Sequence, residues 1–165
     1  MARSLKSTLD EFLGHWKYYI LQSLLATISV YLVLILLNSD ATVVVASLGA
    51  TAFVVFAMPK AVTAQPRNVI GGHIVGLLCG LLGVGLLQML PEACGFFENA
   101  VYAMAVGLSI FIMVVTDTEH PPAAGTALGI ATQGFSIHLI AGVLVFAVLF
   151  TLIRRLLKNK LRDLV

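Results

Sequence analysis

Two acids, a histidine and three hydroxyl groups lie close together in residues 116–129, TDTEHPPAAGTALG. The surrounding chain is mostly hydrocarbon, because 59% of the 165 residues are hydrophobic and only 11% are charged. Ionisable groups beside long apolar runs are costly in a membrane, so they need partners or a function. We therefore take this segment as the first half of a candidate site.

A second polar segment, residues 65–68 (QPRN), carries a permanent cation at Arg67. The fork of a guanidinium group matches two oxygens of a small planar oxyanion. His73 follows six residues later, about 9 Å deeper along a helix, and His120 begins the other polar segment. Either imidazole can donate a hydrogen bond when neutral or take up a proton near neutral pH. The two segments together predict a site for a small anion.

The carboxylates of Asp117 and Glu119 would border this site as counter-charges, as gates or as carriers of a coupled proton. The predicted substrate-binding residues are Gln65, Arg67, Asn68, His73, His120 and Thr126. We predict no catalytic residue, cofactor or metal, because the chain has neither a nucleophile–base pattern nor metal-ligand spacing. The chain is therefore not expected to be an enzyme.

Plainer roles remain open for the same side chains. Arg67 could be only a positively charged anchor on one side of the membrane. Asp117 and Glu119 could be solvated loop residues, or part of a salt bridge that joins two hairpins. His73 could hydrogen-bond a neighbouring helix. His138 lies near a helix start without polar company, which fits a position at a helix interface.

The apolar runs of about 20 residues and a mean hydropathy of +1.00 place the chain among polytopic α-helical membrane proteins. The runs do not alternate in polarity, as the strands of a membrane barrel would. We also predict an interfacial amphipathic helix over residues 1–17 and a basic cytoplasmic tail over residues 154–165. The predicted all-α bundle has six helical segments, at residues 18–37, 42–58, 69–90, 100–115, 122–133 and 137–153.

Basic residues at both ends of the chain predict that both termini are cytoplasmic, which requires an even number of crossings. Either all six segments cross, or residues 42–58 and 122–133 re-enter and leave four full spans. Residues 122–133 are too few to span the hydrocarbon core comfortably. Under either count the third segment leaves one side and the fourth returns to it. Residues 65–68 and 119–122 must therefore lie on the same side.

Both polar segments place proline where a helix begins. Proline suits the first turn because the N–H group that it lacks would be unpaired there. Two helix N-termini would then share one space, with free N–H groups and positive dipole ends that attract an anion. Small residues let neighbouring helices approach closely, which is the role we predict for the glycines. The predicted helix-start and packing residues are Pro66, Pro121, Pro122, Gly72, Gly76, Gly80, Gly125 and Gly129.

Three sequence blocks together resemble the HPP family of small integral membrane proteins. Residues 120–125 (HPPAAG), preceded by the acids of Asp117 and Glu119, resemble the signature that gives the family its name. Residues 47–51 (SLGAT) and 64–73 (AQPRNVIGGH) resemble two further blocks. The resemblance implies a bundle of four membrane-spanning helices. Some members, in cyanobacteria and plastids, are associated with nitrite transport, so the resemblance also implies nitrite as the anion.

We therefore expect a transporter or channel for a small monovalent anion, with nitrite favoured and a proton as the candidate coupling ion. The alternative is a non-transporting bundle that assembles with other membrane proteins through a stripe of glycines spaced four residues apart, Gly72, Gly76 and Gly80. Because no cleavable signal or transit peptide is apparent, we expect a multi-pass protein of a bacterial inner membrane. The expected partners are the lipid bilayer, a small inorganic anion and a second copy of the chain, with no nucleic acid.

Overall fold

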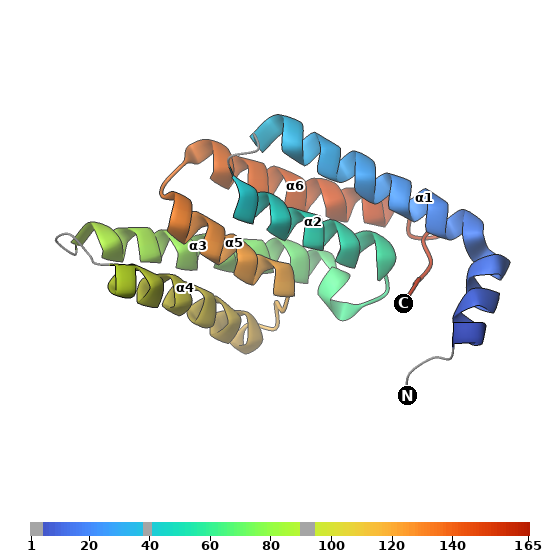
Figure 1. Ribbon diagram of the computed structural model, residues 1–165, viewed down its shortest axis with the longest axis horizontal. Helices are drawn as coiled ribbons and strands as arrows, with labels where there is room; N and C mark the ends of the chain where they lie inside the picture. Colours follow the sequence, from blue (N-terminus) through green and yellow to red (C-terminus); the bar gives the residue numbers. More distant parts are fainter. Residues whose placement is uncertain (1–4, 38–40, 90–94) are drawn as a thin grey trace.

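The computed structural model describes residues 5–37, 41–89 and 95–165, and these residues form helices and connections without a strand (Figure 1). Residues 1–4 of the predicted interfacial helix and residue 90, the last of the predicted third segment, lie outside the described residues. The all-α prediction is confirmed. The helices are α1 (Leu5–Leu37), α2 (Thr42–Ala57), the short 3₁₀ helix η1 (Val62–Ala64), α3 (Pro66–Met89), α4 (Gly95–Val115), α5 (Pro121–Gln133) and α6 (Ile137–Leu156).

The helix starts differ from the predicted ones where apolar patterning alone was followed. The N-terminal helix and the first span, together labelled α1, meet at a kink at His15 (φ −135°), close to the predicted boundary at residue 17. Helix α3 begins at Pro66, three residues before the apolar run, because proline is accommodated in a first turn. Helix α4 begins at Gly95 rather than at residue 100, and Glu98 lies in its first turn, where an acid suits the helix dipole.

Among the described residues, four helices are long and apolar enough to cross a membrane, namely α1, α3, α4 and α6. Helices α2 and α5 have 16 and 13 residues, so they extend about 24 Å and 20 Å at 1.5 Å per residue. A hydrocarbon core is about 30 Å thick. The prediction of four long spans and two shorter helical segments is therefore confirmed.

Successive helices run in opposite directions through the bundle (Figure 1). Helices α1, α3 and α5 start at one end of the bundle, and α2, α4 and α6 run back toward it. We call this end, where α1 begins and α6 finishes, the terminal end. The two short helices follow the same alternation, so neither α2 nor α5 doubles back to the end where it began. The helix starts of α3 and α5 both lie at the terminal end.

Helix α5 is held between α2 and α3 by glycines that leave no room for a side chain. A Cβ atom on Gly76 of α3 would lie 2.4 Å from the carbonyl oxygen of Ala123 in α5. On the other face of α5, a Cβ atom on Gly129 would lie 2.6 Å from Cγ2 and 3.0 Å from the backbone nitrogen of Val44 in α2. The glycines therefore bring backbones together inside this chain. The others in such contacts include Gly72 and Gly80 on α3 and Gly125 on α5.

The C-terminal residues fold back onto the terminal end instead of extending as a free tail. The buried side chain of Gln22 donates to the carbonyl oxygen of Arg162 (2.8 Å) and accepts from the backbone N–H of the same residue (3.0 Å). The backbone N–H of Leu164 donates to the carbonyl oxygen of Ala57 (2.9 Å). The guanidinium group of Arg154 is buried and donates to the carbonyl oxygen of Pro59 (2.8 Å). The predicted basic tail is thus a packed part of the structure.

Candidate functional site

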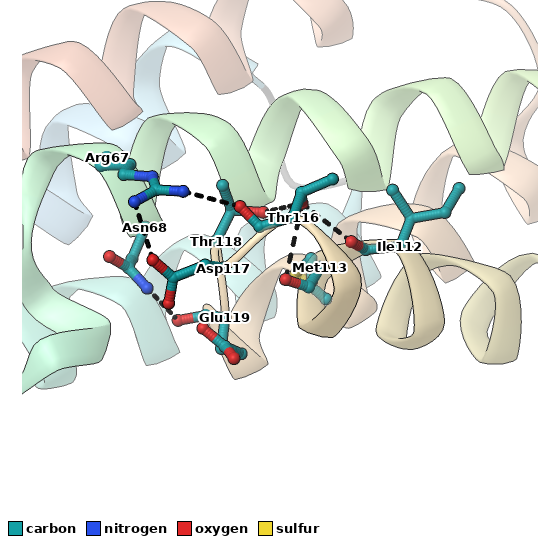
Figure 2. A network of polar contacts seen from close by, with 8 residues as sticks. All are labelled: Arg67, Asn68, Ile112, Met113, Thr116, Asp117, Thr118 and Glu119. Atoms are coloured by element: carbon teal, nitrogen blue, oxygen red, sulfur yellow. Dashed lines mark hydrogen bonds and ion pairs between the residues drawn. The ribbon is translucent and has the colours of Figure 1, made fainter.

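The two polar segments meet at the terminal end, as the topology required (Figure 2). Nη1 of Arg67 lies 2.7 Å from Oδ2 of Asp117, and Nη2 donates to the carbonyl oxygen of Thr116 at 2.8 Å. Nδ2 of Asn68 donates to the carbonyl oxygen of Glu119 at 3.2 Å. The ion pair is open to solvent, with the side chains of Arg67 and Asp117 exposed by 64% and 70%. These contacts join the start of α3 to the connection between α4 and α5.

Asp117 adopts a backbone conformation that usually belongs to glycine. Its φ of 54° lies in the left-handed region, and the other non-glycine residues among those described have negative φ. The N–H of Asp117 bonds to the carbonyl oxygen of Val114, and the N–H of Thr118 bonds to that of Met113. This pair of bonds is the Schellman arrangement that ends a helix, with Asp117 at the position where glycine is preferred. An aspartate there positions its carboxylate beside Arg67.

We expect the Asp117→Gly variant to be more stable than Asp117→Ala by about 1 kcal/mol, because only alanine keeps the cost of a left-handed conformation. Both variants lose the ion pair with Arg67, so their difference isolates the backbone term. The measurement is the free energy of unfolding of the purified proteins in mixed micelles. Equal stabilities for the two variants would contradict the assigned conformation.

A second group of polar side chains lies deeper in the bundle. It comes from the middle of α2, the first half of α3 and the start of α5. Its members are Ser47, Thr51, His73, His120 and Thr126, and we call them the histidine–hydroxyl cluster. Ser47 is 5% exposed, and the other four are fully buried. Oγ1 of Thr51 lies 3.0 Å from Nε2 of His73 and 3.1 Å from Nε2 of His120. One hydroxyl therefore bridges the two imidazole rings.

Each remaining polar atom of the cluster also has a partner. Nδ1 of His73 lies 2.9 Å from Oγ1 of Thr126, and Nδ1 of His120 lies 2.8 Å from the carbonyl oxygen of Thr63. Oγ of Ser47 lies 2.8 Å from Oγ1 of Thr126 and 2.6 Å from the carbonyl oxygen of Pro122. The hydroxyl of Thr51 also lies 3.0 Å from the carbonyl oxygen of Ser47. A buried polar group without a partner would be costly, and this network supplies partners.

The glycines of α3 let the connection before α5 press against the helix and turn His120 inward. A Cβ atom on Gly72 would lie 2.7 Å from Cβ of His120, so only glycine permits this approach. His120 is the residue before Pro121, the first residue of α5, with an extended backbone (φ −139°) that suits a residue before proline. His73 reaches the same place from within α3, and the two ring centroids are 5.1 Å apart.

The cluster contains no carboxylate, lysine or arginine, and burial disfavours the charged form of an imidazole. Its chemistry is that of neutral hydrogen-bond donors and acceptors inside an apolar bundle. The charged residues, Arg67 and Asp117, stand outside it at the surface. Among the described residues, no group of three or more histidines, cysteines or acids lies close enough to hold a metal ion.

The predicted site residues therefore separate into two layers. Arg67, Asp117 and Gln65 are exposed at the terminal end, and Glu119 is half-buried between the layers. His73, His120 and Thr126 lie in the cluster. Asn68, five residues before His73 in α3, is also buried. The structure does not bring Arg67 into contact with either histidine.

Sequence reasoning missed Ser47 and Thr51 as members of the site. Both lie in the block SLGAT, which served only for the resemblance to the HPP family and was given no binding role. The signal was available, because two hydroxyl residues four positions apart lie on one face of a helix. Their spacing places both on the face of α2 that meets α5 and α3.

The fold and the buried polar centre define a multi-pass membrane protein built as a helix bundle. Residues 11–161 match the family model described as HPP, transmembrane region, and the chain belongs to this family. Two transmembrane proteins of Dictyostelium discoideum are similar. One is 39% identical over 93 residues, and the other is 36% identical over 104 residues. These matches cover 56% and 59% of this chain but only 31% and 32% of the relatives, so the chain spans about a third of their length. No solved structure matches.

Proposed function

We propose that this protein is a transporter for a small monovalent anion, with nitrite as the favoured substrate. The observation that carries the proposal is the histidine–hydroxyl cluster, a buried group of uncharged polar side chains within an apolar membrane bundle. Polar groups at membrane depth are expensive and commonly mark a substrate pathway. These side chains are paired with one another in this structure, so an anion would be bound by imidazole and hydroxyl donors released from those pairs, and less tightly than by a buried cation. The choice of nitrite rests on the resemblance to family members that are associated with its transport.

The helix starts of α3 and α5 support the same proposal. Both helices begin with a proline in the first turn, and the start of α5 packs against Gly72, six residues into α3. Helix N-termini present unpaired N–H groups and the positive end of the helix dipole. Short or broken helices that meet in this way are a recurring feature of transporter binding sites. The anion would reach the cluster between these two helix starts.

The ion pair of Arg67 and Asp117 would act at the entrance rather than at the buried centre. Both side chains are largely exposed, so a pair of this kind contributes little to stability and can open at small cost. Arg67 now contacts Asp117 through Nη1 and Thr116 through Nη2, and it would exchange both for two oxygens of the arriving anion, which match its guanidinium fork. Glu119, two residues after Asp117, is half-buried and would oppose entry as a second gate.

The terminal end is proposed to face the cytoplasm of a bacterial cell. The described cations lie in the first half of α1, the connection from α2 to α3, the start of α3, and the C-terminal segment, all at this end of the bundle. Short loops rich in lysine and arginine remain on the cytoplasmic side. In this orientation the paired helix starts and Arg67 open to the cytoplasm.

We expect the Arg67→Ala variant to lose at least nine-tenths of nitrite uptake into liposomes while keeping its unfolding free energy within about 1 kcal/mol, because the ion pair is solvent-exposed. Arg155→Ala is the matched control, since it removes an exposed arginine from the same end of the protein. Its uptake should equal that of the parent. Unchanged uptake in Arg67→Ala would remove Arg67 from the entrance.

The alternative of a non-transporting assembly subunit rested on a glycine stripe free to meet another protein. Gly72, Gly76 and Gly80 instead pack against α5 of the same chain. This observation takes away the main support for the alternative.

A further inference from the structure

The histidine–hydroxyl cluster is placed to make more hydrogen bonds than its neutral form has protons. Three hydroxyl groups and two neutral imidazoles carry five protons. The same side chains approach one another, or a carbonyl oxygen, at hydrogen-bond distance in seven places. Each hydrogen bond uses one proton. Two of the seven short distances therefore lack a proton when both rings are neutral.

The shortage is centred on the hydroxyl of Thr51. The carbonyl oxygen of Thr63 can only accept, so neutral His120 carries its proton on Nδ1 and leaves Nε2 bare. When neutral His73 carries its proton on Nδ1 and donates to Thr126, the hydroxyl of Thr51 faces three acceptors, namely Nε2 of His120, Nε2 of His73 and the carbonyl oxygen of Ser47. It has one proton to donate.

One added proton supplies one of the two missing hydrogen bonds without moving a ring. With Nδ1 of His73 donating to Thr126, a proton on Nε2 makes His120 the charged ring, which donates to Oγ1 of Thr51, and Thr51 donates to Nε2 of His73. The charge can also lie on His73, with Nδ1 donating to Thr126 and Thr51 donating back to His120. The two forms exchange when Nε2 of the charged ring gives its proton to Oγ1 of Thr51 and the hydroxyl proton of Thr51 passes to Nε2 of the other ring.

We propose that His73 and His120 form a single proton-binding site, which holds one proton shared through the hydroxyl of Thr51. The site takes one proton rather than two because the ring centroids are 5.1 Å apart in a buried setting, where two positive charges repel strongly. The shared position is supported by nearly equal distances from Oγ1 of Thr51 to the two Nε2 atoms, 3.0 and 3.1 Å.

The charged groups around the rings leave the proton without a counter-ion in the resting structure. Helices α2 and α5 contribute only hydroxyls and apolar groups, and η1 contributes the carbonyl oxygen of Thr63. Arg67 of α3 and Asp117 are paired with each other at the surface. Glu119 is the nearest acid, and it lines an open pocket of about 320 Å³ together with His120 and apolar side chains of α4. The pocket reaches the edge of the site at His120.

The use of this proton in transport rests on the function proposed above. A monovalent anion beside the cluster cancels the charge of one added proton, so each ligand strengthens the binding of the other. The proton comes from water on the side where the anion enters, rests on an imidazole Nε2, and returns to water where the anion leaves. One proton would then accompany each anion, and uptake would move no net charge.

The test is an imidazole ¹⁵N NMR titration of the full chain carrying His15→Gln and His138→Gln, which removes the two histidines outside the cluster. We expect the two remaining rings together to take up one proton, with both signals moving part of the way. Thr51→Val in the same background should weaken proton binding at least tenfold, a shift of one pH unit in the midpoint. Thr51→Ser keeps the hydroxyl and should follow the parent.

Uptake of two protons, uptake by one ring alone, or no uptake before circular dichroism reports unfolding would overturn the shared site. An unchanged midpoint in Thr51→Val would overturn the bridging role of Thr51. Nitrite flux in liposomes separates this inference from the proposed function. Absence of flux with a normal one-proton titration would overturn transport, whereas flux that ignores a pH gradient would overturn the coupling.

Discussion

The Gly76→Ala variant is expected to be less stable than the parent protein by about 3 kcal/mol, as overpacked buried sites are. The added methyl group would lie 2.4 Å from the carbonyl oxygen of Ala123. That oxygen belongs to the backbone of α5, so no side-chain rotation can relieve the clash and the two helices must separate. Separation of α3 from α5 would also pull His73 away from Thr126. The measurement is the free energy of unfolding in mixed micelles.

The control for this prediction is Gly85→Ala, on the same helix. A Cβ atom there meets nothing within 4 Å, and alanine favours a helix over glycine by about 0.5–1 kcal/mol. Gly85→Ala should therefore be as stable as the parent or slightly more so. Equal stability of the two alanine variants would show that α3 and α5 are not packed through Gly76.

The Thr126→Val variant is expected to reduce nitrite uptake at least tenfold. Valine has nearly the shape of threonine but cannot serve Nδ1 of His73 or the hydroxyl of Ser47, which lie 2.9 and 2.8 Å from Oγ1 of Thr126. Both groups would remain buried with one partner fewer, at a cost of about 1–3 kcal/mol in stability. The hydrogen bonds offered to the anion would be lost with them. Initial rates of uptake into liposomes give the measurement.

Thr132→Val is the matched control for this substitution, because it makes the same chemical change in the same helix. The hydroxyl of Thr132 bonds only to carbonyl oxygens of its own helix, those of Leu128 at 3.0 Å and Gly129 at 3.2 Å. Its loss should leave uptake close to the parent rate. A similar loss of uptake in both variants would mean that a threonine-to-valine change at either position of α5 impairs transport. It would contradict a specific role for the cluster.

The fold was largely predictable because the requirements of a membrane are simple. Long apolar runs gave the four spanning helices, and the shortness of residues 122–133 correctly marked α5 as a half-length helix. Proline marked the starts of α3 and α5 correctly at Pro66 and Pro121. The apolar runs alone began later than the helices, at residues 69 and 100 instead of Pro66 and Gly95, because the polar first turn of a helix is not part of an apolar run.

The site was only partly predictable, because spacing along a chain does not say which way a side chain points. Topology correctly placed Arg67 and Asp117 together, since it required their segments to share one side. It gave no reason to separate Arg67 from His73, which lies inside the bundle two turns further along the same helix. The role of Thr51 depends on contacts between α2, α3 and α5 that only the packed structure contains.

The most direct test of the central claim is nitrite entry into liposomes that contain the purified protein, measured with an inward proton gradient. Protein-free liposomes and liposomes with the Thr126→Val variant at equal density are the references. Transport through the cluster predicts entry at least tenfold above protein-free liposomes, with most of this gain lost in the variant. Entry equal to that of protein-free liposomes, from protein that remains folded, would contradict the assignment of this protein as an anion transporter.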